Sequence, residues 1–263
     1  MKKMNGLNKF NTSNVNNMRA MFQGCTELEN LDLSNFDTSI VKDMSYMFNR
    51  CNKLKEIKGI NKFITNRVTN MSTMFRLCNE LEYLDLSNFE TKYVADMKFM
   101  FDNCNKLKEI KGINKFDTSS VENMKAMFQQ CYTLEYLDLS NFDTSNVSDM
   151  SYMFNTCYRL KEIKGINKFN TSNVNNMSTM FQCCSLLEHL DLSNFETYNT
   201  SDMSYMFHGC NSLKYLNVSK FELKDATFRM FFFGRNDELQ FIAEDKKMKT
   251  IFDDTTKFLK NPF

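Results

Sequence analysis

The chain lacks an excess of charge of either sign. Its 263 residues include 33 Lys and Arg and 32 Asp and Glu, which gives a formal net charge of +1. Nucleic acids and anionic membranes attract proteins mainly through such an excess. The composition therefore argues against nucleic acid as a partner and against charge-driven binding to a membrane.

The start of the chain lacks a long apolar run. The first ten residues, MKKMNGLNKF, contain two lysines with no apolar stretch behind them. This excludes a secretory signal or membrane anchor in the sequence as given, and predicts a cytoplasmic protein with no direct membrane insertion. If the chain is a trimmed piece whose export signal has been removed, we expect a cell-surface or secreted protein instead.

The usual ingredients of a metal site are scarce. Only two histidines occur, His189 and His208, and no Cys-x-x-Cys pair is present, although the chain has nine cysteines and twenty methionines. Tryptophan is absent and Pro262 is the only proline. These absences raise the question of what so much sulfur does in a protein without a recognisable ligand motif.

The sulfur belongs to a repeat. The phrase MSYMFNRC at residues 44–51 returns with its spacing intact, and the steps between copies alternate between 26 and 27 residues. Such a period indicates a solenoid. We divide the chain into a partial repeat at 1–17, eight leucine-rich repeats at 18–228, and a degenerate repeat with a C-terminal helical cap at 229–263. The eight copies begin at Met18, Met44, Met71, Met97, Met124, Met150, Met177 and Met203.

The repeat explains the sulfur as core filling. Sixteen of the twenty methionines occupy two repeat positions, and eight of the nine cysteines occupy a third. A stack of coils places identical residues in columns, whereas a ligand cluster needs different residues that converge on one point. We therefore predict buried columns of Met, Phe and Cys, and no catalytic, cofactor-binding or metal-binding residues.

Two periodicities alternate inside each repeat. From Val41 through Met44, Phe48 and Cys51 the apolar positions are three or four residues apart, as on one side of a short helix. The Leu81-x-x-Leu84-x-Leu86 pattern instead indicates a short strand. This predicts an α/β repeat solenoid, a right-handed leucine-rich-repeat coil with a parallel sheet on the concave face.

Short helices or helical turns are expected on the convex face, and the sequence leaves the choice between them open. Strands stack at about 4.8 Å and helices at roughly 8 to 10 Å, so true helices would bend the stack into an arc.

The full pattern resembles a known family. Leu-x-x-Leu-x-Leu-x-x-Phe-x-x-x-x-Val-x-x-Met-x-x-Met-Phe-x-x-Cys is complete from Leu134 to Cys157 and covers nearly all of residues 7–218. It is similar to the BspA-like leucine-rich-repeat surface proteins of bacteria, mycoplasmas and some protists. The resemblance implies a non-catalytic scaffold for protein interaction, presented at a cell surface, with a role in adhesion or host interaction.

The outward positions of the strands form three columns. Two of them alternate acid and lysine from coil to coil, so we expect each lysine to lie between two carboxylates. The third column contains tyrosines, which are common anchors at protein interfaces. We take this face as the binding surface for a protein or host-surface ligand. The candidate residues are Tyr83, Tyr136, His189, Tyr215, Asp85, Lys111, Asp138 and Lys164.

The two ends differ from the repeats. Residues 229–242 read as a worn ninth copy, with Phe232 and Phe233 in the Met-Phe positions, Asn236 in the cysteine position and Leu239 in the leucine position. At the front, Leu7, Phe10 and Val15 are expected to be exposed. We therefore expect self-association through an uncapped N-terminal edge.

Two alternatives to a surface adhesin are weighed. The first is an intracellular protein-binding module of viral or symbiont type, which the missing signal favours. The second is an enzyme, which is disfavoured because no nucleophile, base and orienting group stand out from the repeat and no phosphate-binding loop is present.

Overall fold

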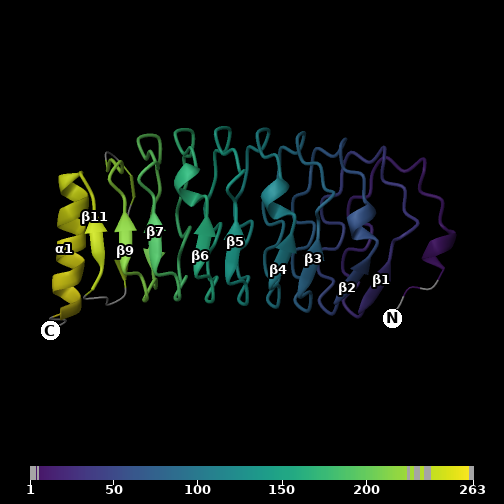
Figure 1. The fold of residues 1–263 in the computed structure, drawn as a ribbon, viewed down its shortest axis with the longest axis horizontal. Helices are drawn as coiled ribbons and strands as arrows, with labels where there is room; N and C mark the ends of the chain where they lie inside the picture. Colours follow the sequence, from purple (N-terminus) through teal and green to yellow (C-terminus); the bar gives the residue numbers. More distant parts are fainter. Residues whose placement is uncertain (1–3, 5, 224–225, 228–231, 234–237, 261–263) are drawn as a thin grey trace.

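The strands of the solenoid lie side by side along one long axis. We describe a computed structural model of residues 4, 6–223, 226–227, 232–233 and 238–260 (Figure 1). Each coil contributes one short strand to the same side of the molecule, which confirms the predicted repeat solenoid of parallel strands. The strands are β1 (Asn30–Asp32), β2 (Glu56–Lys58), β3 (Tyr83–Asp85), β4 (Glu109–Lys111), β5 (Tyr136–Asp138), β6 (Glu162–Lys164), β7 (His189–Asp191), β9 (Tyr215–Asn217) and β11 (Gln240–Ile242).

These strands are hydrogen-bonded in pairs rather than as one continuous sheet. β1 pairs with β2, β3 with β4 and β5 with β6, whereas β7, β9 and β11 form a sheet of three. No hydrogen-bonded ladder joins β2 to β3, β4 to β5 or β6 to β7 within the described residues. The alternation of 26 and 27 residues in the sequence therefore corresponds to a physical unit of two coils.

A glycine turn inserts the extra residue of each second coil. Gly112 has a φ of 87°, and a Cβ atom there would lie 2.4 Å from the Cα of Ser87 in the preceding coil. Both facts exclude any other residue. One turn of 3₁₀ helix follows directly and absorbs the added length. The equivalent short helices are η1 (Leu7–Lys9), η2 (Ile60–Lys62), η3 (Ile113–Lys115) and η4 (Ile166–Lys168).

The opposite side of each coil consists of turns, which decides the choice that the sequence leaves open. In residues 43–51 the amide of Met47 donates to the carbonyl of Met44, while the amides of Tyr46 and Phe48 donate to carbonyls of the next coil at 3.0 and 2.9 Å. Tyr46 and Arg50 adopt positive φ angles of 60° and 63°, which a helix does not contain. We call these segments, and their equivalents in the other coils, the turn face.

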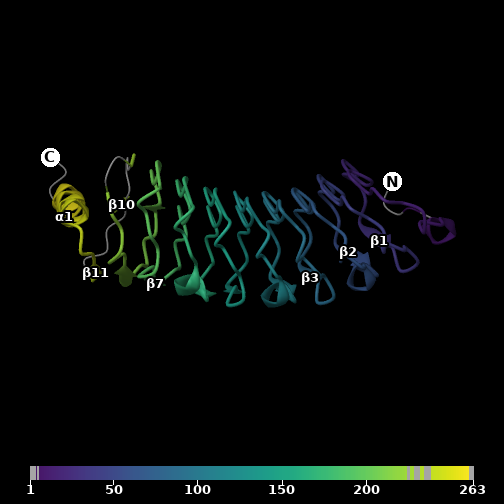
Figure 2. The same ribbon diagram turned by 90° about the horizontal axis from the view of Figure 1, so that it is seen from above.

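The turn face is paired continuously along the stack, unlike the strands. Parallel β-bridges join consecutive turn segments, from Asn17–Asp43 to Asp202–Thr227. The turn segments pair at every coil, whereas the strand ladders are interrupted between two-coil units, so the strand side is the wider of the two. The helices expected on the convex face are absent from the described coils, and Figure 2 shows a gently curved stack whose coils spread apart on the strand side.

The interior is filled by the predicted columns. Met44, Met47, Phe48 and Cys51 are fully buried, and their equivalents are buried in every coil from the second to the eighth. The rings of the Phe48 column stack from Phe22 to Phe207 with centroids 5.4 to 5.8 Å apart. Offset or parallel stacking of this kind adds to the energy of simple burial. The core-filling interpretation of methionine and phenylalanine is confirmed.

A column of buried threonines lies between each strand and the turn segment that follows it in the chain. The Thr91 hydroxyl is buried and donates to the carbonyl of Asp117 in the next coil at 2.8 Å. The Thr65 hydroxyl also accepts the amide of Glu90 at 2.7 Å. Each such hydroxyl links two coils at a corner where the backbone turns away from its neighbours.

At the C-terminus, α1 (Lys246–Lys260) packs against the last coil. Met248 is fully buried, and the rings of Phe241 and Phe252 stack with their centroids 4.3 Å apart.

At the N-terminus, Leu7 is buried, contrary to expectation, because it lies within the core cluster, and Val15 is half-buried. Phe10 is 57% exposed. Self-association through this edge stays a prediction.

The predicted alignment of the ninth copy is wrong by one residue. β10 (Phe232–Phe233) pairs in register with β8 (Phe207–His208), so Phe232 aligns with Phe207. Phe241 aligns with Leu216, where the predicted step of 26 residues would place Ile242. Both steps are 25 residues, shorter than the 26 or 27 of the other coils. Asn236, expected in the cysteine position, lies outside the described residues.

Replacing Met100 with alanine should cost about 2 to 5 kcal/mol of unfolding free energy, because the fully buried side chain leaves a cavity between two coils. Met21 occupies the same repeat position in the first coil but is 41% exposed. The matched Met21→Ala change should therefore cost less than about 0.5 kcal/mol. Urea unfolding followed by circular dichroism measures both, and equal losses would contradict the assigned core.

Candidate functional site

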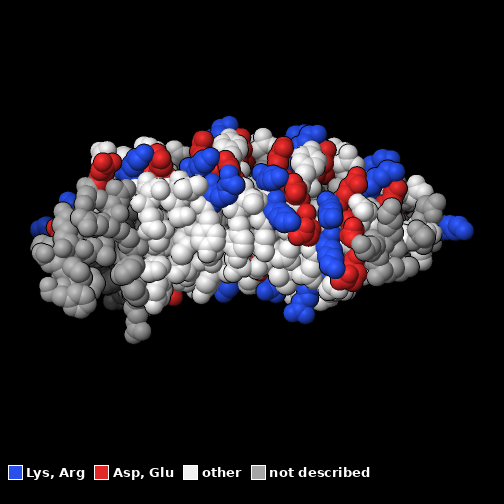
Figure 3. Space-filling model, turned by 90° about the horizontal axis from the view of Figure 1, so that it is seen from below, with Lys and Arg blue, Asp and Glu red and all other residues white. Residues whose placement is uncertain are grey.

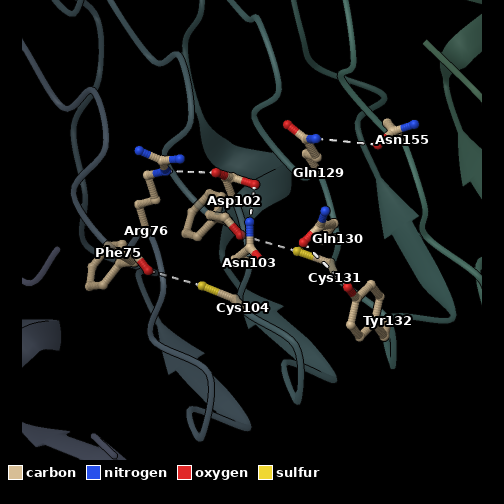
Figure 4. Close-up of polar contacts among 11 residues, drawn as sticks. Phe75, Arg76, Asp102, Asn103, Cys104, Gln129, Gln130, Cys131, Tyr132 and Asn155 are labelled. Atoms are coloured by element: carbon tan, nitrogen blue, oxygen red, sulfur yellow. Dashed lines mark hydrogen bonds and ion pairs between the residues drawn. The ribbon is translucent and has the colours of Figure 1, made fainter. Parts of the chain in front are cut away.

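The cysteine column is held in the core by its own hydrogen bonds. The Cys51 thiol donates to the carbonyl of Phe22 in the preceding coil at 3.1 Å, and the Cys104 thiol donates to that of Phe75 at the same distance (Figure 4). Burial raises the pKa of Cys51 and Cys157 to about 12. These thiols are therefore protonated at neutral pH, whereas the thiolate is the form that acts as a nucleophile or metal ligand.

All nine cysteines are free thiols, and they differ in exposure. Cys25 and Cys183 are half-buried, whereas the other seven are buried. Among the described residues no three His, Cys, Asp or Glu side chains gather closely enough to hold a metal ion. The buried methionine and cysteine side chains thus pack in the columns of the core.

We predict that a thiol-specific reagent at neutral pH labels two cysteines in the folded protein, Cys25 and Cys183, and leaves seven unlabelled until the chain unfolds. Mass spectrometry of labelled peptides identifies the sites. A Cys25→Ser, Cys183→Ser double variant should show no rapid labelling. Rapid modification of Cys104 or Cys131 in the folded state would contradict the assigned burial.

A buried polar network lies beside the cysteine column. Asp102 is 1% exposed, accepts from Arg76 Nε at 2.7 Å and accepts from the Asn103 side-chain amide at 2.7 Å (Figure 4). Burial raises the pKa of Asp102, and the Arg76 guanidinium opposes that shift. Gln129 continues the line by donating to Asn155 at 3.3 Å. The network links neighbouring coils and contains no nucleophile.

Charged side chains on the strand side form ion pairs across each two-coil unit. Lys111 lies 3.1 Å from Asp85, and Lys164 lies 3.0 Å from Asp138. A hydrogen bond from Ser140 and the ion pair with Lys164 lower the pKa of Asp138 to about 2. The remaining pairs on this side are Lys55–Glu29, Lys58–Asp32, Lys108–Glu82, Lys161–Glu135 and Lys214–Glu188.

Each of these lysines pairs with one coil, not two. Every partner lies in the preceding coil of the same two-coil unit, so the expectation of a lysine between two carboxylates is wrong. The reason is the seam between units, where β2 and β3 or β4 and β5 share no hydrogen-bonded ladder. On the long side of the molecule that Figure 3 shows, acidic and basic side chains also lie next to one another rather than in blocks of one sign.

The central column of strand side chains carries the aromatic residues. Tyr83 and Tyr136 are each 47% exposed and occupy the same position in successive two-coil units. His189 is exposed in the next unit, with its ring 6.2 Å from that of the half-buried Tyr215. The structure thus brings the four predicted aromatic residues onto one surface, beside the acid and lysine pairs. We call this surface the strand face.

Two glutamates of the same column were not among the candidate residues. Glu109 is directly opposite Tyr83 in the parallel pairing of β3 with β4, and Glu162 is opposite Tyr136 in the pairing of β5 with β6. Neither glutamate belongs to any ion pair recorded among the described residues. Their place in the tyrosine column, outside both acid–lysine columns, was a sufficient signal in the sequence.

A shallow hollow marks one seam between units. It has a volume of about 350 Å³ and lies between β6 and β7, at the edge of the strand face. Its apolar wall comes from two isoleucines and its rim from polar and aromatic side chains. The lining residues are Ile163, Ile166, Asn167, His189, Asp191 and Tyr215.

Comparison with known proteins assigns the chain to a family. The model of the family described as "Mycoplasma protein of unknown function, DUF285" matches residues 1–109, 77–163 and 136–245, which together span most of the chain. The chain belongs to this family. The match confirms the resemblance to BspA-like leucine-rich-repeat proteins of the mycoplasma type. No curated protein matches the DUF285 chain.

Two solved structures are similar to the DUF285 chain. A leucine-rich repeat protein from Bacteroides ovatus is 19% identical, with a TM-score of 0.37, over 87% of this chain and 66% of that one. A leucine-rich cell surface protein from Faecalibacterium prausnitzii is 14% identical, with a TM-score of 0.30, over 88% and 76%. Within the described parts of the chain, no helix has the length and apolar character needed to cross a bilayer.

Proposed function

We propose that the DUF285 chain is a non-catalytic scaffold that binds a protein or another host-surface ligand through the strand face. The observation that carries the proposal is the exposure of Tyr83 and Tyr136 at equivalent positions of successive units. Exposed aromatic rings on a rigid backbone lose little conformational entropy when they bind. A sheet fixed by core columns on its inner side is such a backbone.

The surroundings of the tyrosines fit protein binding better than catalysis. The acids of the two acid–lysine columns are engaged by lysines or serines, as Asp138 is by Lys164 and Ser140, which lowers its pKa instead of preparing it as a general acid. The side chains also repeat from unit to unit, which extends a binding surface along the axis.

We also propose that the chain is displayed at a cell surface and takes part in adhesion, which the BspA-like resemblance implies. Protease treatment of intact cells that produce the protein tests this placement. Digestion of the protein while a cytosolic marker survives supports display. Survival of both would favour the intracellular binding module instead.

Serine replacement of Tyr83, Tyr136 and Tyr215 together should reduce saturable binding of the fluorescently labelled chain to cultured animal cells by about tenfold or more. Tyr93, Tyr152 and Tyr198 are exposed away from the strand positions and provide a matched triple-serine control that should bind normally. Flow cytometry measures binding, and circular dichroism checks the fold. Equal binding by the two triple variants would contradict the proposed surface.

A further inference from the structure

The unit of β7 and β9 departs from the three units before it in one column of the strand face. In each earlier unit an aspartate of the first strand forms an ion pair with a lysine of the second. These pairs are Asp32–Lys58 at 2.9 Å, Asp85–Lys111 at 3.1 Å and Asp138–Lys164 at 3.0 Å. In the unit of β7 and β9, Asp191 lies opposite Asn217 instead. The repeat therefore keeps the acid and loses its cation.

One oxygen of Asp191 is left without the partner that the repeat provides elsewhere. In Asp32, Asp85 and Asp138 the serine two residues later donates its amide to Oδ1, and the lysine lies at Oδ2. Asp191 Oδ1 accepts the amide of Ser193 at 3.0 Å in the same way. No ion pair or hydrogen bond is recorded for Asp191 Oδ2 among the described residues. This unit therefore lacks the ammonium group that the others contain.

The other charges near Asp191 are already engaged. Lys164, across the seam, is held by Asp138 at 3.0 Å, and Glu162 of the same unit also acts on its charge. Lys214, in the unit of β7 and β9, forms an ion pair at 2.9 Å with the glutamate that precedes β7. Asp191 therefore carries a negative charge that no lysine of its own unit balances.

Asp191 lines the hollow between β6 and β7, whose volume is about 350 Å³. Ile163 and Ile166 form its apolar wall and are only 5% and 6% exposed. The rings of His189 and Tyr215, which lie opposite each other in the pairing of β7 with β9, have centroids 6.2 Å apart and planes 30° apart. In the two preceding units a glutamate stands in the place of the second ring. Apolar surface, two ring faces and an unbalanced carboxylate thus meet at one place.

This combination of groups fits the side chain of arginine. Its methylene stem can pack on the isoleucines while its guanidinium group stacks on the ring of His189 or Tyr215. The same planar group can donate to Asp191 Oδ2, the oxygen that a lysine occupies in the earlier units. A lysine side chain supplies the charge, but its compact ammonium group does not stack as a plane. A neutral aromatic group would leave the carboxylate without a partner.

We propose that the hollow beside Asp191 binds an arginine side chain of a protein partner. The arginine takes the place of the lysine that Asn217 replaces, and it anchors the partner at this end of the strand face. A few such anchors, rather than the whole area of a face, contribute most of the affinity of protein interfaces. The proposal rests on the proposed function and specifies one residue of its ligand.

Binding of N-acetyl-arginine amide to the purified chain tests the proposal. Methyl NMR spectra of the isoleucine-labelled protein should show saturable shifts of Ile163 and Ile166, with a dissociation constant on the order of 1 mM for so small a ligand. Ile110 and Ile113 occupy the equivalent seam between β4 and β5. They are the control inside the molecule, because their signals should stay unchanged.

Two related compounds separate charge from shape. N-acetyl-citrulline amide has nearly the same shape without the charge and should bind at least about tenfold more weakly. N-acetyl-lysine amide keeps the charge but does not stack as a plane, so its affinity should lie between the other two.

Replacing Asn217 with lysine should restore the ion pair of the earlier units and so compete with the ligand. We expect Asn217→Lys to weaken binding of N-acetyl-arginine amide about tenfold, and Asp191→Asn to do the same by removing the charge. The matched control is Asp85→Asn, which removes the equivalent carboxylate of another unit and should leave the affinity unchanged. Asn217→Lys should also reduce binding of the labelled chain to cultured animal cells. Circular dichroism confirms the fold of each variant.

Several results would overturn the proposal. Equal shifts at the two seams would show charge attraction without a site. Equal affinity for the citrulline compound, or unchanged affinity in Asn217→Lys, would show that Asp191 takes no part, and normal cell binding by Asn217→Lys would show that the hollow does not contact the partner. If N-acetyl-arginine amide does not bind while serine replacement of Tyr83, Tyr136 and Tyr215 still reduces cell binding, the proposed ligand is wrong and the proposed function stands.

Discussion

Backbone pairing between turn segments of successive coils sets the rise of the solenoid. In each coil, alternate amides of the turn face donate to the next coil, as Phe75 does to Met100 and Leu77 to Asp102. The positive φ angles of Thr73 and Leu77 allow this arrangement, at a conformational cost that the bonds offset. Because the turn face pairs at every coil and the strand ladders are interrupted between units, the stack curves gently with the strands on its wider side.

The phenylalanine and cysteine columns of the core depend on the regular rise from one turn segment to the next. Phenylalanine rings stack without a gap because consecutive rings are one coil apart, and cysteine thiols reach the phenylalanine carbonyl of the preceding coil for the same reason. The two-coil alternation is superimposed on this rise by the glycine turn at Gly112 and its equivalents. It splits the sheet into pairs and limits ion pairing to one unit. It also repeats the strand-face tyrosines at equivalent positions of successive units.

Much of this architecture was predictable from the sequence, because a repeat shows each position eight times. The pattern Leu81-x-x-Leu84-x-Leu86 located β3 within one residue, and the columns of Met, Phe and Cys predicted the core. The turn face was not predictable, since spacings of three and four fit a helix as well as these turns. Residues such as Tyr46 and Arg50 also carry no sign of a positive φ.

The binding surface was predicted only in part. The tyrosine column was evident, but the pairing of each lysine with a single carboxylate depends on seams that the sequence does not display. Glu109 and Glu162 were therefore treated as part of a face whose charges cancel. The ninth coil was misaligned by one residue because it is shorter than the repeats that define the pattern.

The hydrogen bonding of the turn face can be measured directly by nuclear magnetic resonance on the deuterated chain. A scalar coupling across the hydrogen bond should connect the amide nitrogen of Phe75 with the carbonyl carbon of Met100 in the next coil, at an amide-to-carbonyl distance of 2.9 Å. A coupling from Phe75 to Met71, four residues earlier, would instead identify a helix. That result would contradict the pairing of the turn face on which the structure depends.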